Sequence, residues 1–400
     1  IGSSLLSILL PLSMQRAGFP TELTGLVMSS YYAGLMLGSK YGLAIITRFG
    51  HIRAFAGFAA IVCASVLAHP LWVDVAPWIA LRLVCGFCLA GLFAVMESWL
   101  NDSSTNQTRG RVLSIYLMTN YIAMTAGQLL VNVWEFWQLE PYMVGGLIVA
   151  LSLVPVVMTR ERAPDISRVE PLKLRELFRI SPLSVVGTLC SGLLMGGFYG
   201  MGAVYGQLVQ FDVLGISIFL SALVVGGFLL PFPIGRLSDV LDRRSFMAVA
   251  VAIAAGLSVL GIFLPGLTRE LWLFALLAAL CGGPFSVVYP LSTGQAFDYL
   301  PKERYVAASG GLLLSYAIGA TLGPLACSFV MARLGAPAFF GYFAVVCGAL
   351  LLFTPYRMRM RTPLPARQQE VFKNVPAMSP VAAELDPRAA KSGDAPRAAA

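Results

Sequence analysis

Apolar runs of about 20 residues recur along the whole chain, and a run of this length spans a lipid bilayer when it folds as a helix. Of the 400 residues, 58% are hydrophobic and only 12% are charged, whereas roughly 25% are charged in a soluble domain. No alternating, strand-like pattern dominates, which disfavours a transmembrane barrel. We therefore predict an all-α polytopic membrane protein.

The apolar pattern predicts about twelve membrane-spanning helices. The predicted spans are 1–13, 23–46, 54–71, 77–100, 112–133, 142–158, 183–209, 217–237, 246–264, 271–297, 306–331 and 339–353. The first is short for a span, so we expect the native start of this helix to lie before Ile1. A cleaved signal peptide is the alternative, but the run lacks a basic flank and a small-residue cleavage site.

Basic residues gather in alternate loops between the predicted spans. These loops hold Arg48, Arg53, Arg109, Arg111, Arg243, Arg244, Lys302, Arg304 and the basic residues of segments 160–179 and 357–361. Because Lys and Arg are concentrated on the cytoplasmic side of membrane proteins, we place both termini there, in a bacterial cytoplasmic membrane. The net charge of +8 then reflects membrane orientation and not nucleic-acid binding.

Charged and proline-containing segments divide the chain. We predict an N-terminal half over 1–159, a cytoplasmic linker over 160–181 and a C-terminal half over 182–355. Within the linker, the stretch KLRELF fits either a short amphipathic helix on the membrane surface or a solvated linker. The basic tail over 356–400 lacks apolar periodicity and is predicted to be disordered.

An internal repeat relates the two halves. The second and eighth spans both end in a tight polar turn and a basic cluster, and an offset of 192 residues (226 − 34 = 192) pairs Gly34 with Gly226. A duplicated unit of six spans explains this match.

The repeated turn resembles the loop motif G-x-L-x-D-R-x-G-R-R of the major facilitator superfamily. The second copy keeps Gly235, Leu237, Asp239, Arg243 and Arg244, whereas the first keeps Arg48, Gly50 and Arg53 but has Thr47 in place of the acid. The resemblance implies twelve helices in two pseudo-symmetric halves, alternating access, and a charge latch in these loops. The missing acid leaves the second copy to carry the latch.

Three further resemblances follow. Arg82 and Gly86 resemble the R-x-x-x-G element of the fourth helix, and the stretch ending in Gly319, Gly323 and Pro324 resembles a G-x-x-x-G-P element of drug exporters. The latter lies here on the eleventh span and not on the fifth, which disfavours a drug antiporter. The stretches SSYYAG, VMESWL, RGRVLSIY, AGQLL and LLLSYAIGATLGP resemble the uncharacterised YcaD-like branch of the superfamily over nearly the whole chain.

Charged residues within spans are candidate functional groups because a charge in hydrocarbon is costly. Lys40 either extends toward the cytoplasm or lines a central cavity. Arg82 cannot deprotonate, so we expect it on the solute pathway, with a structural hydrogen-bonding role as the alternative. Glu97 fits a cytoplasmic latch with Arg109 or Arg111, a protonatable coupling group, or a solvated helix end.

Uncharged polar residues within spans are the other cavity candidates. They are Tyr116, Asn120, Gln128, Tyr199, Tyr289, Ser315 and Tyr316. Each either lines the pathway or hydrogen-bonds a neighbouring helix.

The sequence lacks the motifs HExxH, GxSxG and GxxxxGK[ST], so we predict neither an enzyme nor an ATP site, and no cofactor. The seven cysteines lie in apolar runs, and His51 and His69 are far apart, so no metal site is predicted. We predict a monomeric secondary transporter of a small anionic or zwitterionic solute, coupled to protons. The alternatives are a transporter-like sensor or interaction protein without transport, and a multidrug or metabolite exporter.

Overall fold

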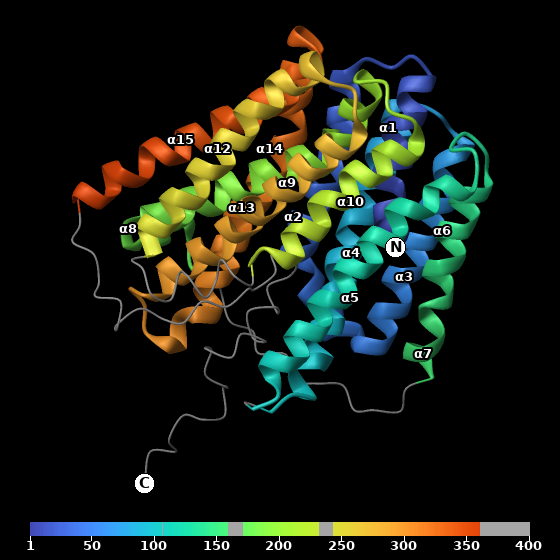
Figure 1. Cartoon of the computed structure of the whole chain (residues 1–400). Coiled ribbons are helices and arrows are strands. Elements are labelled where there is room, and N and C mark those ends of the chain that lie inside the picture. The colour runs from blue at the N-terminus through green and yellow to red at the C-terminus, as the bar shows by residue number, and fades with distance from the viewer. Residues whose placement is uncertain (106, 159–170, 232–242, 361–400) are drawn as a thin grey trace.

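The computed structural model describes residues 1–105, 107–158, 171–231 and 243–360, and every regular element in these ranges is a helix (Figure 1). The first half comprises α1 (Gly2–Arg16), α2 (Thr21–Phe49), α3 (His51–Ala68), α4 (Val75–Asp102), α5 (Arg109–Leu130), α6 (Glu140–Leu151) and α7 (Leu153–Val157). The second comprises α8 (Leu174–Ile180), α9 (Pro182–Leu208), α10 (Val213–Leu229), α12 (Arg243–Leu267), α13 (Leu271–Phe297), α14 (Tyr305–Leu334) and α15 (Pro337–Met360). Short 3₁₀ turns cover His69–Leu71, Val131–Val133 and Lys302–Arg304.

The predicted all-helical class is confirmed, and each of the twelve predicted spans contains a helix. Within the described ranges, eight helical segments are long and apolar enough to cross a membrane, and α10 is a shorter apolar helix. The count of twelve spans and the location of the termini stay predictions.

Three segments refine the predicted pattern. The sixth span divides into α6 and α7, because Pro155 lacks the N–H that would bond to the carbonyl of Leu151. The eighth begins at Val213, where the Asp212 carboxylate accepts a 2.7 Å hydrogen bond from the Gly215 N–H, and its predicted end lies outside the described residues. The stretch KLRELF belongs to α8, whose Leu177 is buried against α14, so this segment is a packed helix.

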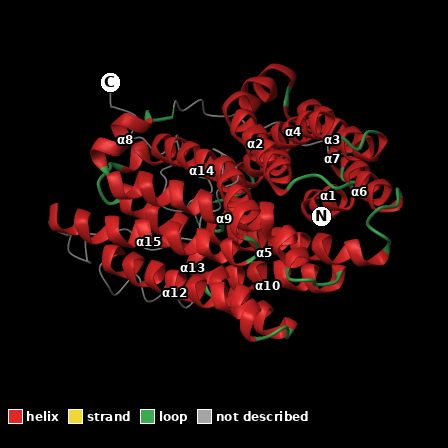
Figure 2. Cartoon of the chain, turned by 90° about the horizontal axis from the view of Figure 1, so that it is seen from above, coloured by secondary structure: helices red, strands yellow, loops and turns green. Residues whose placement is uncertain are grey.

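The offset of 192 residues reappears in the helix boundaries. Helix α3 begins at His51 and α12 begins at Arg243 (243 − 51 = 192). One extensive helix pair also matches, since α2 packs on α4 in the first half and α10 packs on α13 in the second. Seen from above, α3, α4 and α6 gather on one side of the molecule and α12, α13 and α15 on the other (Figure 2).

Equivalent glycines allow these pairs to approach closely. A Cβ at Gly34 would clash with the backbone carbonyl of Leu83 on α4, and a Cβ at Gly226 would clash with that of Ala279 on α13. Small residues at helix contacts let backbones approach each other in lipid. Gly34 and Gly226 therefore serve close packing between helices.

We expect Gly226→Ala to lower the free energy of unfolding by about 1–3 kcal/mol, because the added methyl overpacks a backbone contact. The matched control is Gly256→Ala on α12, where a Cβ meets no atom within 4 Å. It should be neutral or raise that free energy by about 0.5–1 kcal/mol. Unfolding by SDS titration in mixed micelles measures both, and equal effects would contradict the assignment.

The two halves meet toward the ends of the helices that lie away from the basic loops. Ser221 on α10 donates a 3.0 Å hydrogen bond to the Gln128 Oε1 on α5, and Asn132 donates a 2.9 Å hydrogen bond to the Ser217 hydroxyl. The Ser29 hydroxyl on α2 donates to the Thr321 carbonyl on α14. Toward the other side, α12 and α15 diverge from α3 and α6 (Figure 1).

Candidate functional site

Arg82 lies on α4 with 1% of its surface exposed, and its guanidinium carbon is 4.3 Å from the ring centroid of Tyr31 on α2. This geometry depends on Gly86, one turn further along α4. A Cβ at Gly86 would clash with the backbone carbonyl of Tyr31, so only glycine lets α2 approach closely enough for the cation–π contact. The spacing of Arg82 and Gly86 thus has a packing reason.

Two N–H groups of the buried Arg82 are unpaired among the described residues. Within the part of the chain that the structure describes, Nε and Nη1 have no hydrogen-bond partner. Leaving a buried polar group unpaired destabilises a protein by about 1–3 kcal/mol, and more for a charged group. Buried polar groups are nearly always paired. A carboxylate or another oxyanion would match the guanidinium in charge and in hydrogen-bonding geometry.

Six tyrosines from both halves form a connected group that reaches this cation through Tyr31 and Tyr32, and we call them the tyrosine cluster. They are Tyr31 and Tyr32 on α2, Tyr121 on α5, Tyr199 on α9, Tyr289 on α13 and Tyr316 on α14. Ring centroids are 5.2 Å apart for Tyr31 and Tyr32 and 5.3 Å apart for Tyr289 and Tyr316. Tyr32 lies within electrostatic range of Arg82, Tyr199 and Tyr316. The cluster therefore extends from the buried Arg82 in the first half to helices of the second half.

Glu97 is fully buried on α4, and its Oε1 accepts a 2.9 Å hydrogen bond from the Tyr116 hydroxyl. It also lies within electrostatic range of Tyr289 in the second half. The Asn120 side chain donates to the Tyr116 carbonyl at 2.9 Å. The structure thus brings Glu97, Tyr116 and Asn120 together beside the tyrosine cluster.

Other predicted cavity residues have partners of their own. Lys40 is exposed, with its ammonium nitrogen 5.0 Å from the ring centroid of Tyr41. The Ser315 hydroxyl donates a 2.9 Å hydrogen bond to the Val185 carbonyl on α9. Gln128 joins the halves through Ser221. In the described part of the chain, no group of three or more His, Cys, Asp or Glu side chains is placed to hold a metal ion.

Comparison with known proteins identifies the family. The profile of the Major Facilitator Superfamily matches residues 1–267 and 186–389. The chain belongs to the major facilitator superfamily. It is 30% identical over 329 residues to the uncharacterised MFS-type transporter YcaD of Salmonella arizonae, covering 80% of this chain and 83% of that protein. An uncharacterised MFS-type transporter of Enterobacter sp. is 29% identical over 334 residues, covering 82% and 85%.

Solved structures of superfamily transporters share the fold. The nucleoside transporter NupG matches with a TM-score of 0.69 at 15% identity, covering 89% of this chain and 94% of that chain. A bacterial homologue of the human lysosomal transporter Spinster, in an inward-facing and occupied conformation, matches with a TM-score of 0.69 at 14% identity, covering 92% and 95%. The chain is therefore a multi-pass membrane transporter of some solute.

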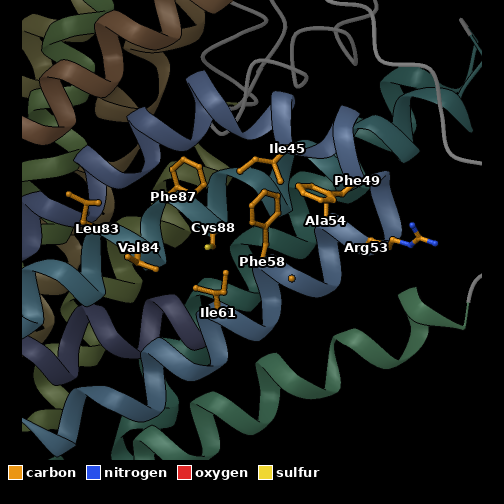
Figure 3. A pocket seen from close by; sticks show the side chains of 11 residues that line it. Ile45, Phe49, Arg53, Ala54, Phe58, Ile61, Leu83, Val84, Phe87 and Cys88 are labelled. Carbon is orange, nitrogen blue, oxygen red and sulfur yellow. The ribbon is translucent and has the colours of Figure 1, made fainter.

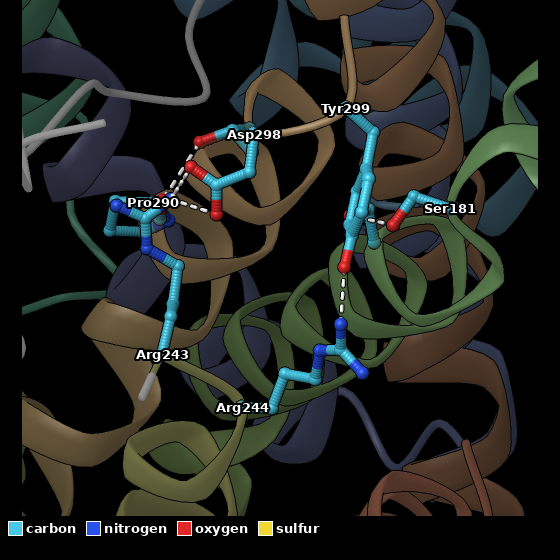
Figure 4. A network of polar contacts seen from close by, with 8 residues as sticks. Ser181, Arg243, Arg244, Pro290, Asp298 and Tyr299 are labelled. Carbon is cyan, nitrogen blue, oxygen red and sulfur yellow. Dashed lines mark hydrogen bonds and ion pairs between the residues drawn. The ribbon is translucent and has the colours of Figure 1, made fainter. Parts of the chain in front are cut away.

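The superfamily loop motif places an ion pair in the second half. Arg243 Nη1 lies 2.8 and 2.7 Å from the two carboxylate oxygens of Asp298, and both side chains are almost fully buried (Figure 4). The neighbouring Arg244 donates to the Tyr299 hydroxyl. Arg243 begins α12 and Asp298 follows α13, so this pair joins two helices of the same half. The motif residues Gly235 and Asp239 lie outside the described residues.

The first copy of the motif is built differently. His51 occupies the position equivalent to Arg243, and its Nε2 lies 3.3 Å from the Ser98 hydroxyl on α4. Gly50, just before it, has φ 84°, a left-handed conformation that favours glycine. Arg48, Arg53 and Arg111 are exposed, whereas Arg109 is 2% exposed at the start of α5. The two halves of this superfamily member therefore differ in charge at the same turn.

The G-x-x-x-G-P element of α14 serves packing. A Cβ at Gly319 would clash with the Leu189 carbonyl on α9, and one at Gly323 would lie too close to the Gly197 nitrogen. Pro324 packs against Gly200, and its carbonyl lies beside Gly25 on α2. The element therefore contacts both α9 and the opposite half.

Sequence reasoning missed three of the six cluster residues and the acid of the ion pair. Tyr31 and Tyr32 lie in the stretch SSYYAG, and Tyr121 lies in the same span as Tyr116. Tyrosine is common at helix contacts and at membrane interfaces, so its type alone carries little signal. Asp298 directly follows the tenth span, on the same side of the predicted bundle as the basic turn at Arg243 and Arg244. An acid next to a predicted span and level with a basic turn could have indicated the ion pair.

Proposed function

We propose that this superfamily transporter is a secondary active carrier that moves a small anionic or zwitterionic solute by alternating access, as a monomer in a bacterial cytoplasmic membrane. The observation that supports the proposal is Arg82, a buried cation with two unpaired N–H groups. A solute carboxylate or other oxyanion would pair with these groups, and the rings of the tyrosine cluster would cover its apolar part.

The contacts between the halves support alternating access. The hydrogen bonds of Gln128 and Asn132 close the molecule on the side away from the basic loops, which the positive-inside rule predicts to be the outer side. The Spinster homologue with the same fold is inward-facing. A solute would reach Arg82 from the cytoplasmic side in this state and leave after the halves rock to the opposite state.

We further propose that transport is coupled to protons and that the Glu97 carboxyl is the group that binds and releases the proton. In wild-type protein, transport should vary with pH over the range in which this buried carboxyl exchanges its proton. Glu97→Gln keeps the shape and a hydrogen bond with Tyr116 but cannot ionise, so its transport should be independent of pH. Counterflow and uphill uptake in proteoliposomes between pH 5 and 8 measure this. The control is Glu140→Gln at the exposed start of α6, and an unchanged pH profile in Glu97→Gln would contradict the role.

A ligand screen on purified protein tests the proposed function. Organic monoanions, zwitterions, cations and neutral solutes are compared by the rise in melting temperature, and each ligand is then tested in counterflow. Stabilisation and counterflow by anions or zwitterions support the proposal. Selective action of cations or neutral compounds would favour the exporter alternative, and binding without counterflow would favour a sensor.

A further inference from the structure

An apolar groove of about 550 Å³ lies between α2, α3 and α4 (Figure 3), and no tyrosine of the cluster lines it. Phe49 of α2, Ile61 of α3 and Phe87 of α4 contribute to its walls, and Gly57 leaves space in the middle. Arg53 is the one charged side chain along its described lining, and it lies at one end. The groove therefore combines a long apolar surface with a terminal positive charge.

The groove opens toward the membrane. Its outer helix α3 packs mainly on α4 and α6 of its own half, and so lies away from the contact between halves. Ile61 is 45% exposed and Val84, on α4, is 39% exposed. Large apolar side chains exposed to this extent on a membrane-spanning helix contact lipid chains, because water is excluded from that region.

The length of the groove matches one leaflet. Arg53 lies in the first turn of α3, next to the basic turn at Gly50, and Ile61 follows eight residues later. Eight residues of helix rise about 12 Å, and one leaflet contributes about 15 Å of hydrocarbon. Arg53 thus lies at headgroup level when the far end of the groove lies near the middle of the bilayer.

A second apolar groove has a similar volume but carries a charge of the opposite sign. It has a similar volume of about 530 Å³ and lies between α3 and α6, but its charged side chain is Glu140. An anionic headgroup would be repelled there and attracted to Arg53, with Arg48 exposed nearby at the end of α2. Basic residues at the membrane surface attract anionic lipids by about 1 kcal/mol each.

We propose that the groove between α2, α3 and α4 binds one acyl chain of an anionic phospholipid, with the lipid phosphate on Arg53. This site does not depend on the proposed solute or its coupling. The bound chain fills the space at Gly57 and contacts three helices at once. Since a ligand that binds only the folded state stabilises it, the occupied site holds α2, α3 and α4 together.

Native mass spectrometry of the full chain released from detergent tests the proposal. Dioleoyl phosphatidylglycerol is compared with dioleoyl phosphatidylethanolamine, which has the same chains and no net charge. The wild-type chain should bind phosphatidylglycerol at least about fivefold more tightly, and Arg53→Gln should remove this preference. Gly57→Leu should weaken binding of both lipids, because its side chain occupies the groove without a clash at Cβ.

Two matched controls separate the site from general lipid contact. Gly256→Leu makes the same change on the exposed face of α12, where Cβ also meets nothing within 4 Å, and Arg359→Gln removes an exposed charge from the last turn of α15. Both should bind phosphatidylglycerol like the wild type. Equal binding of the two lipids by the wild type, or equal losses in Gly57→Leu and Gly256→Leu, would overturn the proposal.

Discussion

Arg82→Met is expected to weaken solute recognition strongly and to make the protein more stable. Losing the charged partner of a buried oxyanion weakens binding by about 2–5 kcal/mol, so counterflow should fall by a factor of about 30 or more. Methionine fills the apolar site without the N–H groups that the structure leaves unpaired. The free energy of unfolding without ligand should therefore rise by about 1–3 kcal/mol. Counterflow in proteoliposomes and SDS titration measure the two effects.

Lost transport together with increased stability would distinguish a solute-binding role of Arg82 from a structural role. If Arg82 were a structural hydrogen-bonding hub, its removal would lower stability together with transport. Arg82→Lys is the matched variant, because it keeps the charge but loses the planar fork. It should retain part of the binding. Transport at the wild-type level in Arg82→Met would exclude Arg82 from the solute pathway.

Asp298→Asn is expected to lower the free energy of unfolding by about 3–5 kcal/mol, because it removes the carboxylate that neutralises the buried Arg243. The control is Asp74→Asn at the exposed start of α4. Asparagine caps a helix about as well as aspartate, so the change should stay within about 0.5 kcal/mol. SDS titration of both variants measures the difference.

A double variant shows that charge imbalance causes the loss. Arg243→Met combined with Asp298→Leu removes both charges and should recover most of the stability lost in Asp298→Asn, since a buried ion pair is often replaceable by apolar residues. If Asp298→Asn alone behaved like Asp74→Asn, the pair would have no structural role.

Most of the fold could be predicted from the sequence, because a membrane-spanning helix needs a long apolar run and such runs are easily recognised. The predicted tenth span, 271–297, coincides with α13. The predicted helix boundaries were wrong where a proline or a capping residue sets the end of a helix, as at Pro155 and Asp212. These boundaries depend on the hydrogen bonding of single backbone N–H groups, which cannot be predicted from the pattern of apolar residues.

The candidate site was only partly predictable. Arg82 and Glu97 stand out because charges are rare within spans, and the structure buries both. The members of the tyrosine cluster come from five helices of both halves, so only the packing of the helices reveals which rings meet. Lys40 shows the opposite case, since a charge inside a predicted span is exposed in the folded chain.

In the described ranges, two hydrogen bonds between side chains of the two halves use amides and hydroxyls. Ser221, Gln128, Asn132 and Ser217 carry no formal charge, and a neutral hydrogen bond contributes about 1 kcal/mol. Ionic strength screens interactions between charges and leaves neutral hydrogen bonds largely unaffected. We therefore expect the opening of these contacts between the halves to depend little on salt concentration.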